Sequence, residues 1–590
     1  MLGKIIQPYR IWIAGILFVA ILFLTAGWYT RIDLTAEKRY TLSPSTQQLL
    51  NEVDSTIDVQ VFLTGELPAN YKKLSVATAE LLDEFKTRSH NHLRVTFALP
   101  DENISNDTVR MQLYDSLTRL GVVFETSEEV GSKREKKVSQ RIIPSALVSY
   151  RDGQKPISID LRSSRKIFRP FDVINQSPEE DVEATRNAAE ALLEYKFANA
   201  IDKLTRKNIP VVAYVTGNGE PVDYTVSDLY ETLFSRYQLG RFDLEKGFPN
   251  ASLIQALIVV KPTLPFTEED KLKLDQYVMN GGKIIWFIDK LHAELDSLMR
   301  NKGGYTAFDR GLELDDLLFK YGVRIQPDLL QDLNCAKLPI VVGKNPDGSP
   351  VMQRIPWPYY PFLSARNFHP ISANLERVLP IFPSSIDTVK SPGIQKTILL
   401  ATDSNSRSIS SPAQVTLNSV RSAEDFSSFN KSYLPVAVLL EGTFHSLFAG
   451  RATAALQDSV LRASGVPFAA ENKQPTQQIV VSDADIVTNP VSAGMGPQSM
   501  GELPFENYRF ANRDFFLNAL DYLVSERKLY ESRNKDFVLR LLDKNRVEQE
   551  RLQWQLVNML LPLLMFFLVA WVVQSIRRKK FQQPGSIIQQ

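Results

Sequence analysis

Two long runs without a charged residue lie near the two ends of the 590-residue chain. Residues 11–30 form a run of 20, and residues 552–576 form a run of 25. Because an α-helix rises about 1.5 Å per residue, each run is long enough to cross a hydrocarbon core of about 30 Å. The pattern predicts two transmembrane helices. A cleaved signal peptide is the alternative for the first run, and a buried core helix is the alternative for the second.

The charges beside these runs predict their orientation. Four consecutive basic residues, Arg577–Lys580, follow the second run, and such clusters stay on the cytoplasmic side. With two spans, residues 1–10 and the basic tail 577–590 are then both cytoplasmic. The chain is predicted to be a two-pass protein of the cytoplasmic (inner) membrane with a large periplasmic part. Residues 531–551 precede the second span as a charged juxtamembrane stalk, or as an element that docks a partner.

The first part of the external region, residues 31–206, has hydrophobic patterns that alternate between strand and helix. Strand patterns occur at 57–63 and 92–99, helical spacing at 71–88, 107–120 and 178–206, and a hairpin is expected around 151–154. The resulting order, β-α-β-α-β-β-α, predicts a thioredoxin-like domain. It lacks a Cys-x-x-Cys pair, so we interpret it as a scaffold. The charged stretch 127–141 is interpreted as a solvated loop.

The second part, residues 207–530, contains continuous apolar runs at 209–220, 256–260 and 479–486, which alternate with helical patterns. Strands of this kind are typical of a parallel sheet covered on both faces. Thr267 and Asp270 resemble a capping box at the start of one helix, and 512–524 is a late helix. The pattern predicts a doubly wound, glutamine-amidotransferase-like α/β domain, in which residues 300–475 continue the sheet with large loop insertions.

Composition narrows the class of protein. The 68 Lys and Arg residues nearly balance the 67 Asp and Glu residues, which argues against a dedicated nucleic-acid binder. The net charge of +1 combines two basic ends, which carry six basic residues and no acidic ones, with a remainder of net charge −5. The single cysteine, Cys335, excludes an internal disulfide and any multi-cysteine metal site.

No group of residues forms a recognisable catalytic pattern. The strand at 256–260 runs into Lys261-Pro262-Thr263, where amidotransferase-like folds place a nucleophilic cysteine, and Cys335 lies in a loop-like stretch without a nearby histidine. Gly217 and Gly219 are interpreted as a tight strand-to-helix turn, because a dinucleotide fingerprint needs a third glycine. The chain also lacks the phosphate-binding motif of an ATPase.

Metal and cofactor sites are not predicted either. His90 and His92 have no third ligand nearby and are interpreted as surface residues, and His292, His369 and His445 are isolated. Asp483 and Asp485 follow a strand, where they either bind an ion or cap loops; we favour loop caps. We therefore expect no catalytic, cofactor-binding or metal-binding residues, no cofactor, and no enzyme activity.

Several segments together resemble the GldG family, the gliding-motility-associated auxiliary components of ABC transporters in Bacteroidetes. They occur in the family's order over nearly the whole chain, at residues 31–46, 212–221, 266–289, 434–442, 480–486, 512–523 and 539–558. The resemblance implies a substrate-binding or auxiliary subunit that works with a multispanning permease and a cytoplasmic ATPase and supports gliding.

Three hypotheses follow. The first is a non-catalytic subunit of an ABC transporter complex, because two spans are too few to form a transport path alone. The second is an envelope hydrolase or amidotransferase relative, which requires a nucleophile that the sequence does not show. The third is a free-standing external sensor or adhesion module. The sequence favours the first.

Overall fold

The computed structural model divides the chain into two compact units, residues 1–537 and 538–590. The residues that it describes are 41–102, 104–128, 139–151, 154–163, 182–206, 208–300, 304–346, 348–367, 369–416, 423–492, 494, 496–503, 509–525, 527–534 and 544–581. The predicted helix at 11–30, the N-terminus before it and most of the basic tail lie outside these residues.

A four-stranded sheet with the strand order β2-β1-β5-β6 lies at the centre of the N-terminal region. β1 (Ile57–Val61) pairs in parallel with β2 (Leu93–Phe97) and antiparallel with β5 (Ser145–Ser149). β6 (Ile157–Asp160) pairs antiparallel with β5 at the edge of the sheet. The first strand therefore occupies a central position and contacts two segments that follow it much later in the chain.

Helices complete the core of this region. They are α2 (Pro44–Asn51), α3 (Ala69–Arg88), α4 (Asp107–Arg119) and α5 (Val182–Thr205). The Ser43 hydroxyl accepts a hydrogen bond from the Thr46 amide (3.3 Å) and caps α2. Along α3 the buried positions Leu74, Leu82 and Phe85 recur at helical spacing and pack against β1. The strands of the four-stranded sheet and the helices α3, α4 and α5 follow the predicted order.

One hairpin was not predicted. β3 (Glu125–Glu128) and β4 (Ser139–Ile142) pair antiparallel at the two ends of the charged stretch that we expected to be a solvated loop. The loop interpretation is wrong for these ends, because their backbone groups bond to one another across the ladder. Residues 129–138 lie outside the described residues, as do most of the expected hairpin turn and the start of the predicted helix at 178–206.

A mixed eight-stranded sheet organises the rest of the first unit, in the order β16-β18-β21-β22-β10-β9-β7-β8. Five neighbouring strands are parallel: β7 (Val211–Thr216), β8 (Gln238–Asp243), β9 (Ala256–Val260), β10 (Lys283–Phe287) and β22 (Thr476–Val481). Three are added antiparallel: β21 (Pro435–Gly442), β18 (Ile394–Ala401) and β16 (Ser364–Ala365). β18 and β21 continue the sheet as expected, but the expectation of a parallel sheet is wrong for them, because a continuous apolar run shows burial on both faces but not strand direction.

Helices cover both faces of this sheet. In β9, Ile258 packs toward one core with α6 (Ser227–Phe234) and α12 (Asn512–Val524), while its neighbour Val259 packs toward the other core. That second core includes α7 (Glu268–Met279) and α9 (Asp315–Tyr321). The capping box of Thr267 and Asp270 is present at the start of α7, as predicted.

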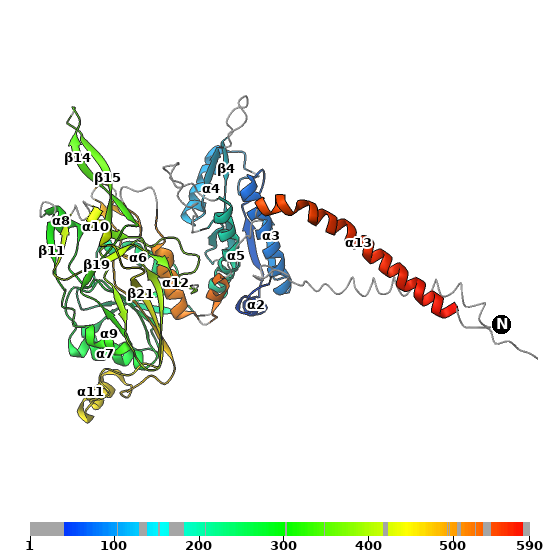
Figure 1. Ribbon diagram of the computed structural model, residues 1–590. Helices are drawn as coiled ribbons and strands as arrows, with labels where there is room; N and C mark the ends of the chain where they lie inside the picture. The colour runs from blue at the N-terminus through cyan, green and yellow to red at the C-terminus, as the bar shows by residue number, and fades with distance from the viewer. Residues whose placement is uncertain are drawn as a thin grey trace, which may run out of the picture. The chain divides into compact units, whose positions relative to one another are not determined.

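Residues 300–475 were expected to continue the sheet with large loop insertions, and these insertions have a core of their own. Its strands pair as two-stranded ribbons: β11 (Gly304–Ala307) with β20 (Ala413–Thr416), β12 (Val323–Ile325) with β17 (Ile386–Thr388), β13 (Asp328–Asp332) with β19 (Ser406–Ser410), and β14 (Cys335–Lys344) with β15 (Pro350–Pro361). Trp357, Tyr359 and Phe382 are buried among these ribbons. The long β14–β15 hairpin projects from the body of this region (Figure 1).

Short elements complete the first unit. They are α8 (Leu295–Arg300), α10 (Ala423–Ser427), α11 (Ala454–Ser464), β23 (Val491–Ser492), β24 (Gly496–Pro497), and the 3-10 helices η1 (Tyr224–Val226), η2 (Leu244–Lys246) and η3 (Leu529–Asn534).

The second unit contains one long helix, α13 (Lys544–Phe581), drawn in red in Figure 1. Its segment Gln553–Arg578 has a mean hydropathy of 2.5, and none of its most apolar part is buried. By length and composition this segment can cross a membrane. The alternative of a buried core helix does not agree with this exposure. The helix begins before the predicted span, since residues 544–551 of the expected stalk are already helical.

A buried charge cluster joins α5 to α12. Asp521 of α12 accepts hydrogen bonds from Tyr237 and, at 3.4 Å, from Tyr195 of α5. Lys203, one α5 turn from Arg206, interacts electrostatically with the same cluster. Burial lowers the pKa of Lys203 to about 7. The positive charge of Arg236 lowers this pKa further, whereas the negative charge of Asp521 raises it. The ammonium form of Lys203 is therefore destabilised in the folded chain.

We predict that the substitution Lys203→Met abolishes a pH-dependent part of the stability. Because the pKa of Lys203 is lowered on folding, the unfolded chain binds more protons between about pH 7 and 10.5, and stability rises with pH in that window. The expected contribution is about 2 kcal/mol between pH 7 and 9. Urea unfolding of the full chain at both pH values measures it, and an equal rise in the variant contradicts the assignment.

Candidate functional site

The carboxyl ends of the parallel strands meet at one edge of the large sheet, the usual position of ligand sites in open α/β folds. The loops after β7, β9, β10 and β22 leave the sheet there. Each loop begins with a polar segment that directly follows an apolar strand. A functional site is therefore expected at this edge before any other part of the sheet.

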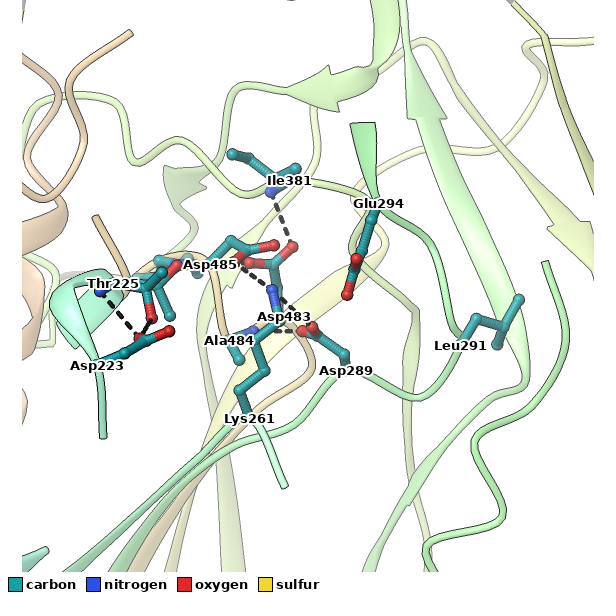
Figure 2. A network of polar contacts seen from close by, with 12 residues as sticks. Asp223, Thr225, Lys261, Asp289, Leu291, Glu294, Ile381, Asp483, Ala484 and Asp485 are labelled. Atoms are coloured by element: carbon teal, nitrogen blue, oxygen red, sulfur yellow. Dashed lines mark hydrogen bonds and ion pairs between the residues drawn. The ribbon is translucent and has the colours of Figure 1, made fainter. Parts of the chain in front are cut away.

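Three carboxylates gather at this edge. Asp289 follows β10, and Asp483 and Asp485 follow β22; their oxygen atoms lie within 4.8 Å of one another. Figure 2 shows these side chains with Lys261, which follows β9. We call Lys261, Asp289, Asp483 and Asp485 the carboxyl-edge cluster.

Lys261 contributes a positive charge to the cluster. Its Nζ atom lies 2.6 Å from Asp485 Oδ1 and 3.4 Å from Asp289 Oδ2. The guanidinium of Arg310 lies 3.9 Å from Asp289. Lys261 itself has a positive φ of 49°, a strained conformation for a residue with a side chain. The ion pairs of Lys261 with Asp485 and Asp289 therefore lie where the backbone bends at the end of β9.

The carboxylates also bind backbone amides. Asp483 accepts hydrogen bonds from the amides of Ile486 (3.1 Å) and Ile381 (2.8 Å), and Asp289 accepts one from the amide of Ala484 (2.7 Å). Asp485 accepts one from the Thr488 hydroxyl (2.7 Å). These bonds agree with the interpretation of Asp483 and Asp485 as loop caps.

The charged side chains of the cluster interact mainly with one another. Burial raises the pKa of Asp483 well above its usual range, and Asp485 and Asp289 raise it further. Burial also raises the pKa of Asp289. Burial alone would lower the pKa of Lys261, but Asp485 and Asp289 outweigh it and raise the value. Lys261 and Arg310 supply two positive charges beside the three carboxyl groups, so the chain provides counter-charges for the cluster itself. The arrangement suits an ion-pair network that ties loops together.

We predict that Lys261→Met lowers the stability of the chain by about 3 kcal/mol, because it leaves buried carboxylates without their cation. Adding Asp485→Asn should recover part of the loss. Lys246→Met, which removes a lysine whose side chain is 81% exposed, should cost less than about 1 kcal/mol. Thermal unfolding measures all three. A rise in the unfolding temperature of the unmodified chain on addition of calcium would contradict this assignment and indicate a cation site.

The glycine pair after β7 forms a tight turn, as expected. Gly217 and Gly219 have positive φ values of 130° and 77°, and a Cβ atom on Gly219 would lie 2.2 Å from the Thr263 hydroxyl. The amides of Thr263 and Leu264 donate to the Asn218 carbonyl at 2.9 Å. The turn therefore packs closely against the loop that follows β9 and is hydrogen-bonded to it.

Sequence reasoning missed Glu220 and Asp289. Glu220 is buried beside the turn, and burial raises its pKa to about 7. Its Oε2 atom accepts a hydrogen bond from the Asn218 amide at 2.8 Å. The signal in the sequence was an acidic residue within four positions after an apolar strand, which Glu220, Asp289 and Asp483 share.

The histidines are not brought together. His90 is exposed in the turn after α3 and has a positive φ of 51°, and His92 lies just before β2, so the two do not share a strand face. His369 packs edge-on against Tyr522, with its pKa lowered by burial. His445 lies 3.4 Å from Glu471.

Cys335 lies in a different environment from the one expected. The expectation of a loop is wrong: Cys335 is buried and begins strand β14, because its neighbours pair with β15. Burial raises the pKa of its thiol to about 12, and Asp332 raises it further. The reactive thiolate is therefore scarce at neutral pH.

We predict that Cys335 does not react with iodoacetamide in the folded chain at pH 8, because only about one thiol in ten thousand is ionised at that pH. The unfolded chain in urea should be labelled at the ordinary rate. Mass spectrometry of the labelled peptide compares the two states. Rapid labelling of the folded chain would contradict the prediction.

The large-sheet region matches a known protein family. Residues 209–519, slightly more than half of the chain, match the model of the ABC-type uncharacterized transport system family. The chain belongs to this family. Residues 36–149 match a separate domain of unknown function. The family associates the large-sheet region with ABC-type transport systems.

Similar proteins are distant. An uncharacterized protein of Borreliella burgdorferi is 23% identical over 307 residues, and the match covers 51% of each chain, so this chain spans about half the length of that relative. Among solved structures, the N-terminal domain of mmIFT52 is 12% identical and has a TM-score of 0.29, with 53% of this chain and 97% of that one covered. A ThuA-like protein from Parabacteroides merdae is 12% identical and has a TM-score of 0.24, with 54% and 91% covered.

Proposed function

We propose that the protein is a non-catalytic, membrane-anchored auxiliary subunit of an ABC transporter complex. It works with a multispanning permease and a separate cytoplasmic ATPase. The observation that carries the proposal is the family match over the large-sheet region in a chain that also has an exposed, apolar helix long enough to span a membrane. A domain of this family attached to a single described span is suited to accompany a permease.

The anchoring is part of the same proposal. The basic residues Arg577 and Arg578 at the end of the apolar segment favour a cytoplasmic C-terminus, with the folded first unit on the periplasmic side. A second span at residues 11–30 would return the N-terminus to the cytoplasm. The likeness of the sequence segments to the GldG family supports a role in gliding motility in a bacterium of the Bacteroidetes.

A non-catalytic role is supported by the groups at the carboxyl edge and by the cysteine. Lys261 is held protonated between two carboxylates, so its amine is not available as a nucleophile. The Cys335 thiol is buried with a raised pKa. These are the positions at which an amidotransferase-like or thiol-dependent hydrolase would need a reactive group.

We predict that the tagged full chain, purified from its own membranes in mild detergent, co-isolates a multispanning permease and an ATPase in fixed proportions. Quantitative mass spectrometry measures the proportions, and an unrelated single-span membrane protein with the same tag is the control. Recovery of the chain alone at several detergent concentrations would contradict the proposal. Labelling of a Ser by an activity-based hydrolase probe would favour the enzyme hypothesis instead.

A further inference from the structure

Strand β8 forms an open edge of the large sheet. It stands last in the strand order, and among the described residues it pairs only with β7. The Gln238 amide donates to the Pro210 carbonyl (3.0 Å) on the β7 side. Because backbone groups alternate in direction along a strand, those of Gly240 and Phe242 also face β7, and those of Arg241 face outward. Such an edge is a template for pairing with another strand.

Two opposite charges lie along this edge. Arg241 and Asp243 are two positions apart in β8, so their side chains lie on the same face of the sheet. Arg241 is exposed, and only its Nη2 atom meets the Tyr230 hydroxyl, at 3.5 Å, which leaves other guanidinium donors for a partner. Asp243 lies 3.0 Å from Lys246, whose side chain is 81% exposed. Both charges can therefore be reached from outside the chain.

An exposed aromatic pair lies beside the same edge. Phe234, at the end of α6, is 65% exposed and stacks on Tyr230, with the two ring centroids 6.2 Å apart. Because the Tyr230 hydroxyl meets Arg241, this part of α6 lies over β8. The edge thus combines open backbone groups, accessible charges and apolar surface, a combination suited to contact with another protein surface.

The charges on β8 are complementary to those of a second copy of β8. In an antiparallel pair of identical strands, a two-fold axis relates the two copies. When Phe242 lies on this axis, Arg241 of each copy is opposite Asp243 of the other copy. With Arg241 on the axis, two like charges would instead lie opposite each other, which is destabilising. The charged side chains therefore favour the register centred on Phe242.

This register also leaves room for the N-terminal region. Tyr237, directly before β8, shares Asp521 with Tyr195 of α5, so the amino end of β8 lies next to the junction between the two regions. Phe242 lies near the carboxyl end of the strand. A two-fold axis at this position places the two junctions at opposite ends of the shared edge, where they do not obstruct each other.

We propose that two copies of the chain join their large sheets edge to edge through antiparallel pairing of β8. Arg241 of each copy pairs with Asp243 of the other, and the Phe234 side chains of the two copies are covered beside the joint. The same surface is used by both copies, as in most two-fold symmetric dimers. The proposal goes beyond the proposed function and rests on β8 and α6 alone.

The test is charge reversal in the full chain, purified in detergent, with light scattering to separate the mass of the protein from that of the detergent. The variants are Arg241→Asp and Asp243→Arg, measured alone and as an equimolar mixture. Each variant alone places like charges at both contacts, whereas a mixed dimer has opposite charges at both. Arg324→Asp is the matched control, because Arg324 is an exposed arginine opposite Asp387 in another pair of strands.

The unmodified chain and the control variant are expected to form dimers at about 10 μM. Each edge variant alone should raise the dissociation constant at least about tenfold, because two attractive pairs become repulsive. The mixture should return to within about threefold of the unmodified chain. Near-ultraviolet circular dichroism checks that each variant is folded, and recovery in the mixture cannot arise from a damaged fold.

Three outcomes would overturn the proposal. One is a monomeric unmodified chain at concentrations up to about 100 μM. The second is unchanged dimerisation of both edge variants, which would place the contact elsewhere, for instance on α13. The third is a mixture that associates no better than the separate edge variants, because the register centred on Phe242 requires recovery.

Discussion

The large-sheet region depends on the burial of its central strands on both faces. β9 is completely buried, and alternate residues such as Ile258 and Val259 face two different hydrophobic cores. At about 25 cal/mol per Å² of apolar surface removed from water, two such layers supply much of the driving force for folding. Helices must cover both faces for this burial to occur, which explains why α6 and α12 pack on one side and α7 and α9 on the other. The same stacking brings the loops that follow the parallel strands to one edge.

That edge is where many α/β proteins bind ligands, but here the polar groups mainly bind one another. Lys261 lies between Asp485 and Asp289, and Asp289 and Asp483 accept hydrogen bonds from backbone amides of neighbouring loops. An ion-pair network of this kind stabilises loop positions, and it is costly to disrupt because each partner is desolvated. Within the described residues, the projecting β14–β15 hairpin and the apolar helix α13 present further exposed surface.

The transport-system family and the exposed apolar helix both agree with a membrane-associated component of a transport system. A rigid region of the family fold is joined to a smaller α/β region, and the residues at their junction carry opposed charges such as Lys203, Arg206 and Asp521. The lowered pKa of Lys203 shows that burial at this junction disfavours its positive charge. Such groups make the contact between the two regions sensitive to protonation, whereas the cores on either side are apolar and insensitive.

Local sequence determined the elements whose signals are contained in neighbouring residues. The helix at 512–524, the capping box of Thr267 and Asp270, the glycine turn after β7 and an apolar segment able to span a membrane all follow from spacing and composition within a few turns of chain. Strand direction does not: the apolar runs of β18 and β21 resemble those of parallel strands, yet both strands pair antiparallel with their neighbours. Only the tertiary structure decided that Cys335 begins a buried strand, that Lys261 meets Asp289 and Asp485, and that Asp54 pairs with Arg151. These pairings join residues from 28 to 224 positions apart, and they form because packing of the whole sheet or of neighbouring regions brings distant loops together.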